Sequence, residues 1–236
     1  MNDISTIPIN DLTQKYFSNN LLQTYFLNSL SSTFKYGEKF FMKSLSNYVK
    51  EHPEFKERII EFNKEERTHT NWHIALNKKI DEINGTNAVD TLQEFTCKLL
   101  NVIEKLPNKD KLLITEALEH ITYSLCKEAL DRNELVKLQG DAYKVLYAHS
   151  LEETGISHST IAGDVYKAIK GNKIKRKLIL TPAILALTLV IISYIGYQYK
   201  ENDKPIISLD TVEGMVYLLN PKGWLLTSIV NMYKTW

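Results

Sequence analysis

Residues 54–80, EFKERIIEFNKEERTHTNWHIALNKKI, form the stretch that decides the fold. Its apolar residues recur every three or four positions, which is the spacing of one face of an α-helix. The same face carries ionisable side chains in its middle, where a bundle helix normally buries apolar ones. The whole stripe consists of Phe55, Ile59, Phe62, Glu66, His69, His73, Leu76 and Ile80. The stretch therefore predicts a buried helix with a polar site halfway along it.

Further apolar stripes of helical spacing run on both sides of this helix. They are interrupted at His52-Pro53, Asn84-Gly85 and Pro107-Asn108, residue pairs that commonly end helices. Only nine glycines and six prolines occur in 236 residues, which disfavours a fold built of many turns. We predict an all-α chain in three parts: an irregular, loose arm over 1–19, a helical bundle over 20–172, and a C-terminal part over 173–236.

Carboxylates and imidazoles recur on the apolar faces of the other predicted helices. In chain order, these side chains are Glu38, Glu66 with His69, Glu119, and finally Glu152 or Glu153 with His158. Two divalent cations need several anionic oxygens and a neutral imidazole each, and helical bundles hold metal pairs with such residues. Burying four carboxylates without cations would cost many kcal/mol. The pattern therefore predicts a two-metal centre inside the bundle.

Four blocks of the sequence also resemble, in order, a bacterial family known as predicted metal-dependent hydrolases, which belongs to the ferritin-like bundles. The blocks are FKYGEKFF (34–41), FNKEERTHTNWHIALN (62–77), TEALEHIT (115–122), and the segment from AHSLEE to SHSTIAGDVYK (148–167). The family has a GE-x-FF start, a helix with Q-E-x-x-H-x-x-x-H-x-x-x-N, an EH pair, and an E-E-x-E-H ending. The resemblance implies a ferritin-like bundle that binds metal.

Carried over residue by residue, the resemblance implies a set of site residues. The metal ligands are Glu38, Glu66, His69, Glu119, Glu153 and His158. His73 becomes a further ligand or a proton relay, and His120 and His149 become groups that orient the ligating carboxylates. The metals are expected to be two iron ions, with manganese or zinc as alternatives.

The chain departs from the family pattern at two places. The family glutamine is replaced by Glu65, which we expect to point away from the site. The last motif, EETGISH, has two extra residues, so Glu153 and His158 lie five positions apart. In a regular helix that spacing turns them about 140° away from each other. They converge only if the helix bulges near Gly155; otherwise Glu152 or Glu153 binds metal and His158 does not.

An uncharged, largely apolar run over 178–199 follows the bundle, with four basic residues just before it. About 20 apolar residues suffice to cross a membrane. We predict a helix that spans or is embedded in a membrane, with the bundle on the cytoplasmic side according to the positive-inside tendency. A buried core helix or a membrane-surface hairpin is the alternative. Residues 205–236 are predicted either to lie along the membrane interface or re-enter it, or to pack on the bundle as two short helices.

The composition limits the function. Lysine and arginine (29) nearly balance aspartate and glutamate (28), so we expect no nucleic-acid partner. The first hypothesis is an oxygen-activating di-iron enzyme that acts on a small hydrophobic substrate, such as a lipid or fatty acyl chain, with an external electron donor. The second is hydrolysis by two metals that activate water. A non-catalytic metal-binding protein or membrane scaffold is the third, and the sequence leaves a homodimer open.

Overall fold

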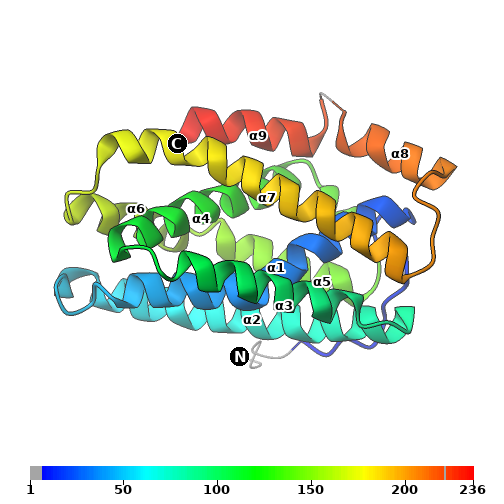
Figure 1. The fold of residues 1–236 in the computed structure, drawn as a ribbon, viewed down its shortest axis with the longest axis horizontal. Helices are drawn as coiled ribbons and strands as arrows, with labels where there is room; N and C mark the ends of the chain where they lie inside the picture. Colours follow the sequence, from blue (N-terminus) through cyan, green and yellow to red (C-terminus); the bar gives the residue numbers. More distant parts are fainter. Residues whose placement is uncertain (1–6, 221) are drawn as a thin grey trace.

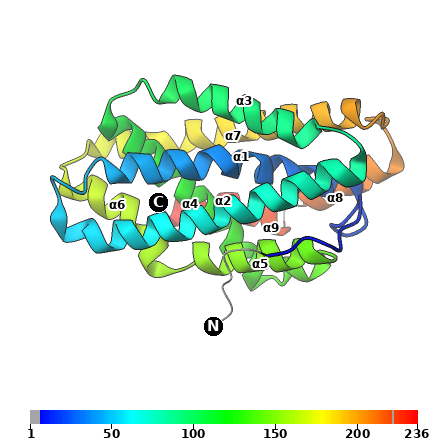
Figure 2. The ribbon, with the colours of Figure 1, turned by 90° about the horizontal axis from the view of Figure 1, so that it is seen from below.

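The computed structural model describes residues 7–220 and 222–236, and these residues form helices and no β-strand. The all-α prediction is thereby confirmed. Figures 1 and 2 show the long helices running along a common axis. In chain order they are α1 (Leu21–Ser46), α2 (Lys56–Asn84), α3 (Ala88–Ile103), α4 (Asn108–Asp131), α5 (Asp141–Glu153), α6 (Ile156–Ala168), α7 (Lys173–Glu201), α8 (Leu209–Leu218) and α9 (Trp224–Thr235), with 3₁₀ turns η1 (Pro53–Phe55) and η2 (Glu134–Lys137).

The inner bundle consists of α1, α2, α4 and the consecutive pair α5 and α6. Helix α1 packs on α2 and α4, while α5 and α6 contact both α2 and α4. Helices α3 and α7 cover α1 from outside, and α8 and α9 cover the ends of α1 and α4. The two short C-terminal helices therefore pack on the bundle, which was one of the two alternatives predicted for this segment.

Helix α2 forms where the stripe of residues 54–80 predicts it. Ile59, Phe62, Leu76 and Ile80 are buried toward its two ends, in two separate apolar clusters. The helix ends at Asn84, because Gly85 adopts a left-handed conformation with φ 65° that glycine reaches without a steric penalty. The polar middle of the stripe is thus held rigidly between two apolar anchors.

The chain breaks between α5 and α6 instead of bulging. Helix α5 ends at Glu153, and Gly155 is extended, with φ −63° and ψ 134°, before α6 begins at Ile156. Because of the break, Glu153 and His158 lie on two different helices. The angle of about 140° expected between them in one continuous helix therefore does not apply. Both side chains are buried, and His158 lies in the first turn of α6.

Helix α7 is long and apolar enough to cross a membrane. This criterion uses only length and composition, and core helices of soluble proteins and signal sequences also meet it. In this structure it lies lengthwise against α1, α3 and α4. Leu180, Ile191 and Tyr194 are buried in that contact, while Leu185 and Leu189 are exposed on the other side. The helix therefore has one face on the bundle and one apolar face that no described residue covers.

The N-terminal segment is irregular, but residues 7–19 are not loose as the sequence suggested. Tyr16 and Phe17 are buried against α2 and the region around α5. The carboxylate of Asp141, at the start of α5, accepts hydrogen bonds from the backbone N–H groups of Asn10 (2.7 Å) and Asp11 (2.8 Å). This carboxylate therefore anchors the arm to the bundle.

Asp141→Asn is expected to lower the free energy of unfolding by about 1–2 kcal/mol at pH 7, because it removes the charge from the hydrogen bonds that this carboxylate accepts. The effect is no larger because solvent partly screens the carboxylate. The backbone of Asp11 and then Lys144 hold the pKa of Asp141 at about 2. A depressed carboxyl pKa stabilises the fold above its unfolded value of about 4, and this contribution is lost as the pH falls from there toward about 2. Urea unfolding at pH 7 and pH 3 measures it; a difference between variant and parent that does not shrink at pH 3 contradicts this role.

Candidate metal centre

The six predicted ligands come from five helices and are all buried. Glu38 lies on α1, Glu66 and His69 on α2, Glu119 on α4, Glu153 on α5 and His158 on α6. Each of the six residues is at most 3% exposed. Because each comes from the apolar side of its helix, the packing that forms the bundle also brings them toward its axis.

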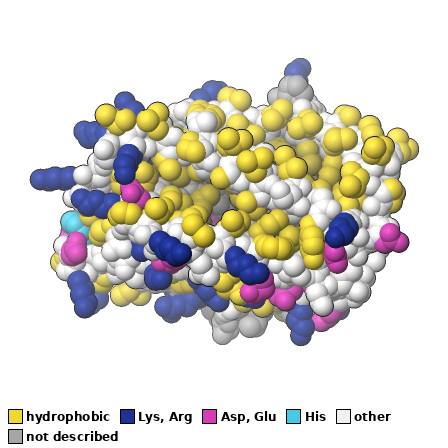
Figure 3. Space-filling model, viewed as in Figure 1, with side chains coloured by type: hydrophobic (Ala, Val, Ile, Leu, Met, Phe, Trp, Pro, Cys, Tyr) yellow, Lys and Arg dark blue, Asp and Glu magenta, His cyan; other side chains and the backbone are white. Residues whose placement is uncertain are grey.

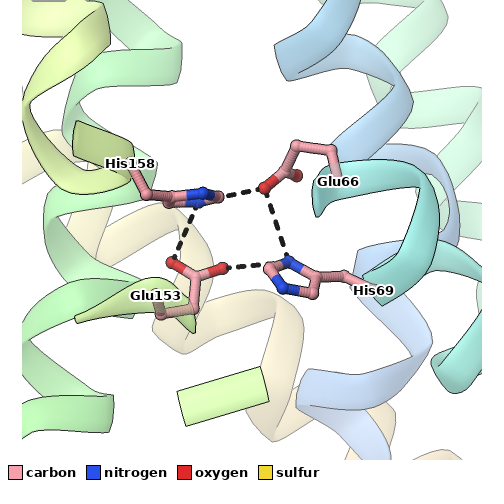
Figure 4. Close-up of side chains that lie close together, drawn as sticks. All are labelled: Glu66, His69, Glu153 and His158. Atoms are coloured by element: carbon pink, nitrogen blue, oxygen red, sulfur yellow. Dashed lines mark ion pairs between the residues drawn. The ribbon is translucent and has the colours of Figure 1, made fainter. Parts of the chain in front are cut away.

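Glu66, His69, Glu153 and His158 surround one point, and each offers a ligand atom within 4.8 Å of the others (Figure 4). His158 Nε2 lies 3.1 Å from Glu66 Oε1 and 3.7 Å from Glu153 Oε2. His69 Nδ1 lies 3.5 Å from Glu66 Oε1. The break at Gly155 thus brings His158 to the cluster despite the two extra residues.

Glu119 and Glu38 are further buried carboxyl groups close to this cluster. Glu119 Oε2 lies 3.5 Å from His158 Nε2. Glu38 Oε2 accepts a hydrogen bond from Thr70 at 2.7 Å, which leaves its other oxygen without a partner. The negative charge of Glu66 acts on both carboxyl groups, so all four glutamates share one electrostatic environment.

The inward atoms of the cluster lack hydrogen-bond partners. These buried atoms are Glu38 Oε1, both oxygens of Glu66, His69 Nδ1, Glu119 Oε2, Glu153 Oε2 and His158 Nε2. Native proteins leave few buried polar groups unsatisfied, and each such group calls for an explanation. Seven such atoms, more than half of those found among the described residues, belong to the six predicted ligands, and all seven are atoms that coordinate divalent metals.

The outer nitrogens of both histidines, by contrast, are bound to carboxylates. His69 Nε2 contacts Glu152 Oε2 at 2.8 Å, and His158 Nδ1 contacts Glu65 Oε2 at 2.8 Å. A carboxylate on the outer nitrogen fixes the ring and its tautomer, so that the inner nitrogen presents a lone pair to a metal. In the last motif, Glu153 therefore points into the cluster, whereas Glu152 contacts His69 from outside.

Glu65 contacts a residue of the site, contrary to our prediction that it points away. It directly precedes Glu66 on α2 and therefore lies about 100° around the helix, out of the cluster itself. It nevertheless reaches His158, which approaches from α6. The family's glutamine at this position was a signal, because a glutamine can also accept a hydrogen bond from an imidazole N–H.

Replacing Glu65 or Glu152 by alanine is expected to weaken metal binding about 10–100-fold while leaving all six ligands in place, since outer partners of ligating histidines have effects of that size. Glu57→Ala is the matched control, because Glu57 is an exposed carboxylate on α2 outside the cluster. Competition with a chromophoric chelator measures the affinity. Equal affinities for all three variants and the parent would show that these carboxylates do not orient the histidines.

His73 and His149 form a hydrogen-bonded chain behind the cluster. His149 Nε2 contacts Glu153 Oε1 at 2.8 Å, and its Nδ1 contacts His73 Nε2 at 2.7 Å. His73 Nδ1 in turn contacts the hydroxyl of Ser31 at 2.8 Å, and that hydroxyl donates to Asn77. Together with Glu38, the two histidines form a second group able to hold a metal. Their mutual hydrogen bond occupies ring nitrogens, however, which fits the predicted relay and orienting roles.

His120 lies outside the cluster, contrary to its predicted role. Its Nε2 contacts the carbonyl oxygen of Met232 at 3.0 Å, and its ring lies against Trp236. Because His120 directly follows Glu119, it points about 100° away from the bundle axis, toward α9. The side chain therefore helps to fasten α9 to α4.

The pKa shifts of the glutamates follow from their burial and from their closeness to one another. Burial first, and then repulsion from Glu153 and Glu66, raises the pKa of Glu119 to about 8. Burial and the charge of Glu66 likewise raise the pKa of Glu38 well above its usual value. Burial alone would raise the pKa of Glu153 too, but His158 and His149 hold it at about 2. Protons and imidazolium groups thus supply part of the positive charge that the site requires.

The residues fit a pair of divalent cations. Across residues 7–220 and 222–236, Glu66, Glu119 and Glu153 form ion pairs only with histidines, and none of the four glutamates is paired with lysine or arginine. Four carboxylates would balance the four positive charges of two divalent ions, and the neutral imidazoles of His69 and His158 would complete the donor set. Fold and site together define an all-α protein with a buried carboxylate–histidine centre suited to divalent metals.

Comparison with protein families agrees with this class. Residues 5–236 match the family model described as predicted metal-dependent hydrolase, so the chain belongs to that family. Neither curated proteins nor solved structures gave a match. Membership is therefore shown over nearly the whole chain, whereas the ferritin-like relationship stays a prediction.

Proposed function

We propose that this chain is an enzyme with a two-metal centre held by Glu38, Glu66, His69, Glu119, Glu153 and His158. The observation that carries the proposal is the convergence of unpartnered, buried oxygen and nitrogen atoms from five helices. The outer carboxylates Glu65 and Glu152 support it, because they leave the inner nitrogen of each ligating histidine available. His149 and His73 would hold or pass a proton at Glu153 Oε1.

We further propose that the metals are iron and that the centre activates dioxygen. A donor set of four carboxylates and only two imidazoles favours this chemistry, since anionic oxygens stabilise oxidised iron. An apolar cavity that reaches His149 also supports oxidation of a hydrophobic substrate. Bound iron would supply the electrons for oxygen reduction, and an external donor would restore them.

Hydrolysis is the second candidate, favoured by the description of the family. Two divalent ions, of zinc or manganese, would lower the pKa of a bound water and hold the substrate. In that case the chain His149–His73 would accept the proton that the water loses. Both candidates need the same six ligands, so the metal and its response to oxygen separate them.

Loading the metal-free protein with ferrous iron under nitrogen, followed by oxygen, tests the first candidate. We expect two irons per chain, consumption of oxygen and a new near-ultraviolet absorption, all absent from Glu66→Ala. Exposed Glu57→Ala is the control and should behave like the parent. If iron gives no oxygen-dependent signal while zinc or manganese binds at two per chain, the oxidative proposal is wrong and hydrolysis is favoured.

A further inference from the structure

A cavity of about 580 Å³ lies between α1, α3, α4 and α7, next to the metal-binding cluster. Apart from a few hydroxyls, Cys126 and His149, its walls are aliphatic and aromatic, with Phe34, Phe41 and Leu118 among them. At its inner end lies His149, whose Nε2 contacts the ligand Glu153 at 2.8 Å. A molecule in the cavity would therefore end one side chain away from the centre.

The three threonines and Ser31 in the cavity wall are already engaged in hydrogen bonds. The hydroxyls of Thr33 and Thr122 donate to carbonyl groups of their own helices. Thr96 is hydrogen bonded to Tyr194 at 2.8 Å, and Ser31 is part of the chain to His73. Among the residues that the structure describes, no lysine, arginine, aspartate or glutamate lines the cavity. These walls offer a polar or charged ligand little beyond dispersion contacts, which suits a hydrocarbon chain.

The mouth of the cavity lies between α3 and α7. Leu99 and Val102 of α3 line the cavity and are also 49% and 64% exposed. Pro182 and Ala186 of α7 likewise line it and are exposed. Since these residues face the cavity and the outside at once, the cavity opens between them.

The surface around this mouth is apolar. Exposed apolar side chains continue from it along both helices: Phe95 on α3, Leu106 just beyond the end of α3, and Leu178, Leu185, Leu189 and Ile192 on α7. The space-filling view of this face shows hydrophobic side chains gathered over it, with basic residues toward one end (Figure 3). Lys173 and Lys177 are exposed at the start of α7. An apolar face with lysines at its margin fits the headgroup region of an anionic membrane.

We propose that the cavity binds one hydrocarbon chain of a membrane-lipid-derived substrate, which enters from the bilayer between α3 and α7. The inference rests on the proposed function, because it places the reacting end of that chain beside His149 and the metal centre. Helix α7 then lies in the membrane surface rather than across it. Its inner face forms the cavity wall, and its outer face contacts lipid.

Displacement of cis-parinaric acid by saturated fatty acids of 8 to 18 carbons, in the metal-loaded full-length protein, tests the cavity. Each added methylene is worth about 0.8 kcal/mol when buried, which is a roughly fourfold change in affinity. We expect affinity to rise by on the order of tenfold per two carbons until the cavity is filled. Ala186→Trp, at the mouth, should weaken binding of the longer chains at least tenfold.

The matched control is Leu185→Trp, because Leu185 is next to Ala186 but is exposed and does not line the cavity. It should bind the probe like the parent. Absence of saturable binding, absence of chain-length dependence, or equal behaviour of the two tryptophan variants would overturn the proposal. The titration is repeated after chelation, so that the two hypotheses are tested separately. Fatty-acid binding by a protein that binds no metal refutes the metal centre alone. Metal binding by a protein that binds no fatty acid refutes the cavity alone.

Sedimentation with phosphatidylglycerol vesicles tests where the chain comes from. Leu185→Asp with Leu189→Asp should reduce the vesicle-bound fraction several-fold and leave displacement by dissolved fatty acid unchanged. If parent and variant bind vesicles equally, or if neither binds, entry from the membrane is wrong and a dissolved acyl compound is the source.

Discussion

Glu66→Ala is expected to abolish stoichiometric metal binding. Both oxygens of Glu66 are buried without hydrogen-bond partners, and one of them lies within 3.5 Å of the inner nitrogens of both His69 and His158. Its removal would take away the carboxylate that lies between the two histidines of the proposed site. The loss should exceed about 100-fold in affinity, since even outer partners of ligating histidines are worth 10–100-fold.

Metal per chain, measured by inductively coupled plasma emission after dialysis against a weak chelator, checks this result. We expect two equivalents in the parent, at most one in His158→Ala and none in Glu66→Ala. Exposed Glu61→Ala on the same helix is the control and should retain both. Circular dichroism establishes that each variant is folded. Unchanged metal content in folded Glu66→Ala would contradict the assignment.

Removal of the metals is expected to lower the thermal stability by about 10 °C. A ligand that binds only the folded chain at 1,000 times its dissociation constant contributes about 4 kcal/mol. In a chain of this size, 1 kcal/mol corresponds to about 2–4 °C in Tm. The metal-free chain should nevertheless stay folded, because the raised pKa values of Glu38 and Glu119 let these carboxyls take up protons in place of the lost cations.

Differential scanning calorimetry of the metal-loaded and the chelated protein measures this difference. Glu66→Ala serves as the reference, because it should give the same Tm with and without metal. A parent chain whose Tm does not respond to metal, or a Glu66→Ala variant that responds as the parent does, would show that the stabilising ions bind elsewhere.

The buried cluster of glutamates and histidines was predictable from the sequence because helical spacing fixes which side chains share a face. Glu66 and His69 interrupt an otherwise apolar stripe, and that conflict identifies them without any structure. His120 was misassigned because a histidine next to a ligand in sequence lies on another face of the helix. The burial and unpartnered atoms of the six ligands came from packing, which the sequence pattern only implied.

What the sequence could not supply depends on contacts between separate helices. Glu65 meets His158 across α2 and α6, and neither residue's own helix reveals the pair. The approach of His158 depended on whether the chain bulged or broke near Gly155, and helical spacing alone did not decide between them. Hydropathy identified α7 as apolar, yet it did not reveal that α7 lies along the bundle and forms one wall of a cavity.

A crystal structure of the iron-loaded protein, with anomalous diffraction recorded on both sides of the iron absorption edge, tests most directly whether the six proposed ligands hold two metals. We expect two iron peaks within coordination distance of Glu38, Glu66, His69, Glu119, Glu153 and His158, with Glu65 and Glu152 still on the outer nitrogens of the two histidines. Peaks coordinated by other residues, or a cluster closed by direct hydrogen bonds among its own side chains with no peak, would contradict this expectation.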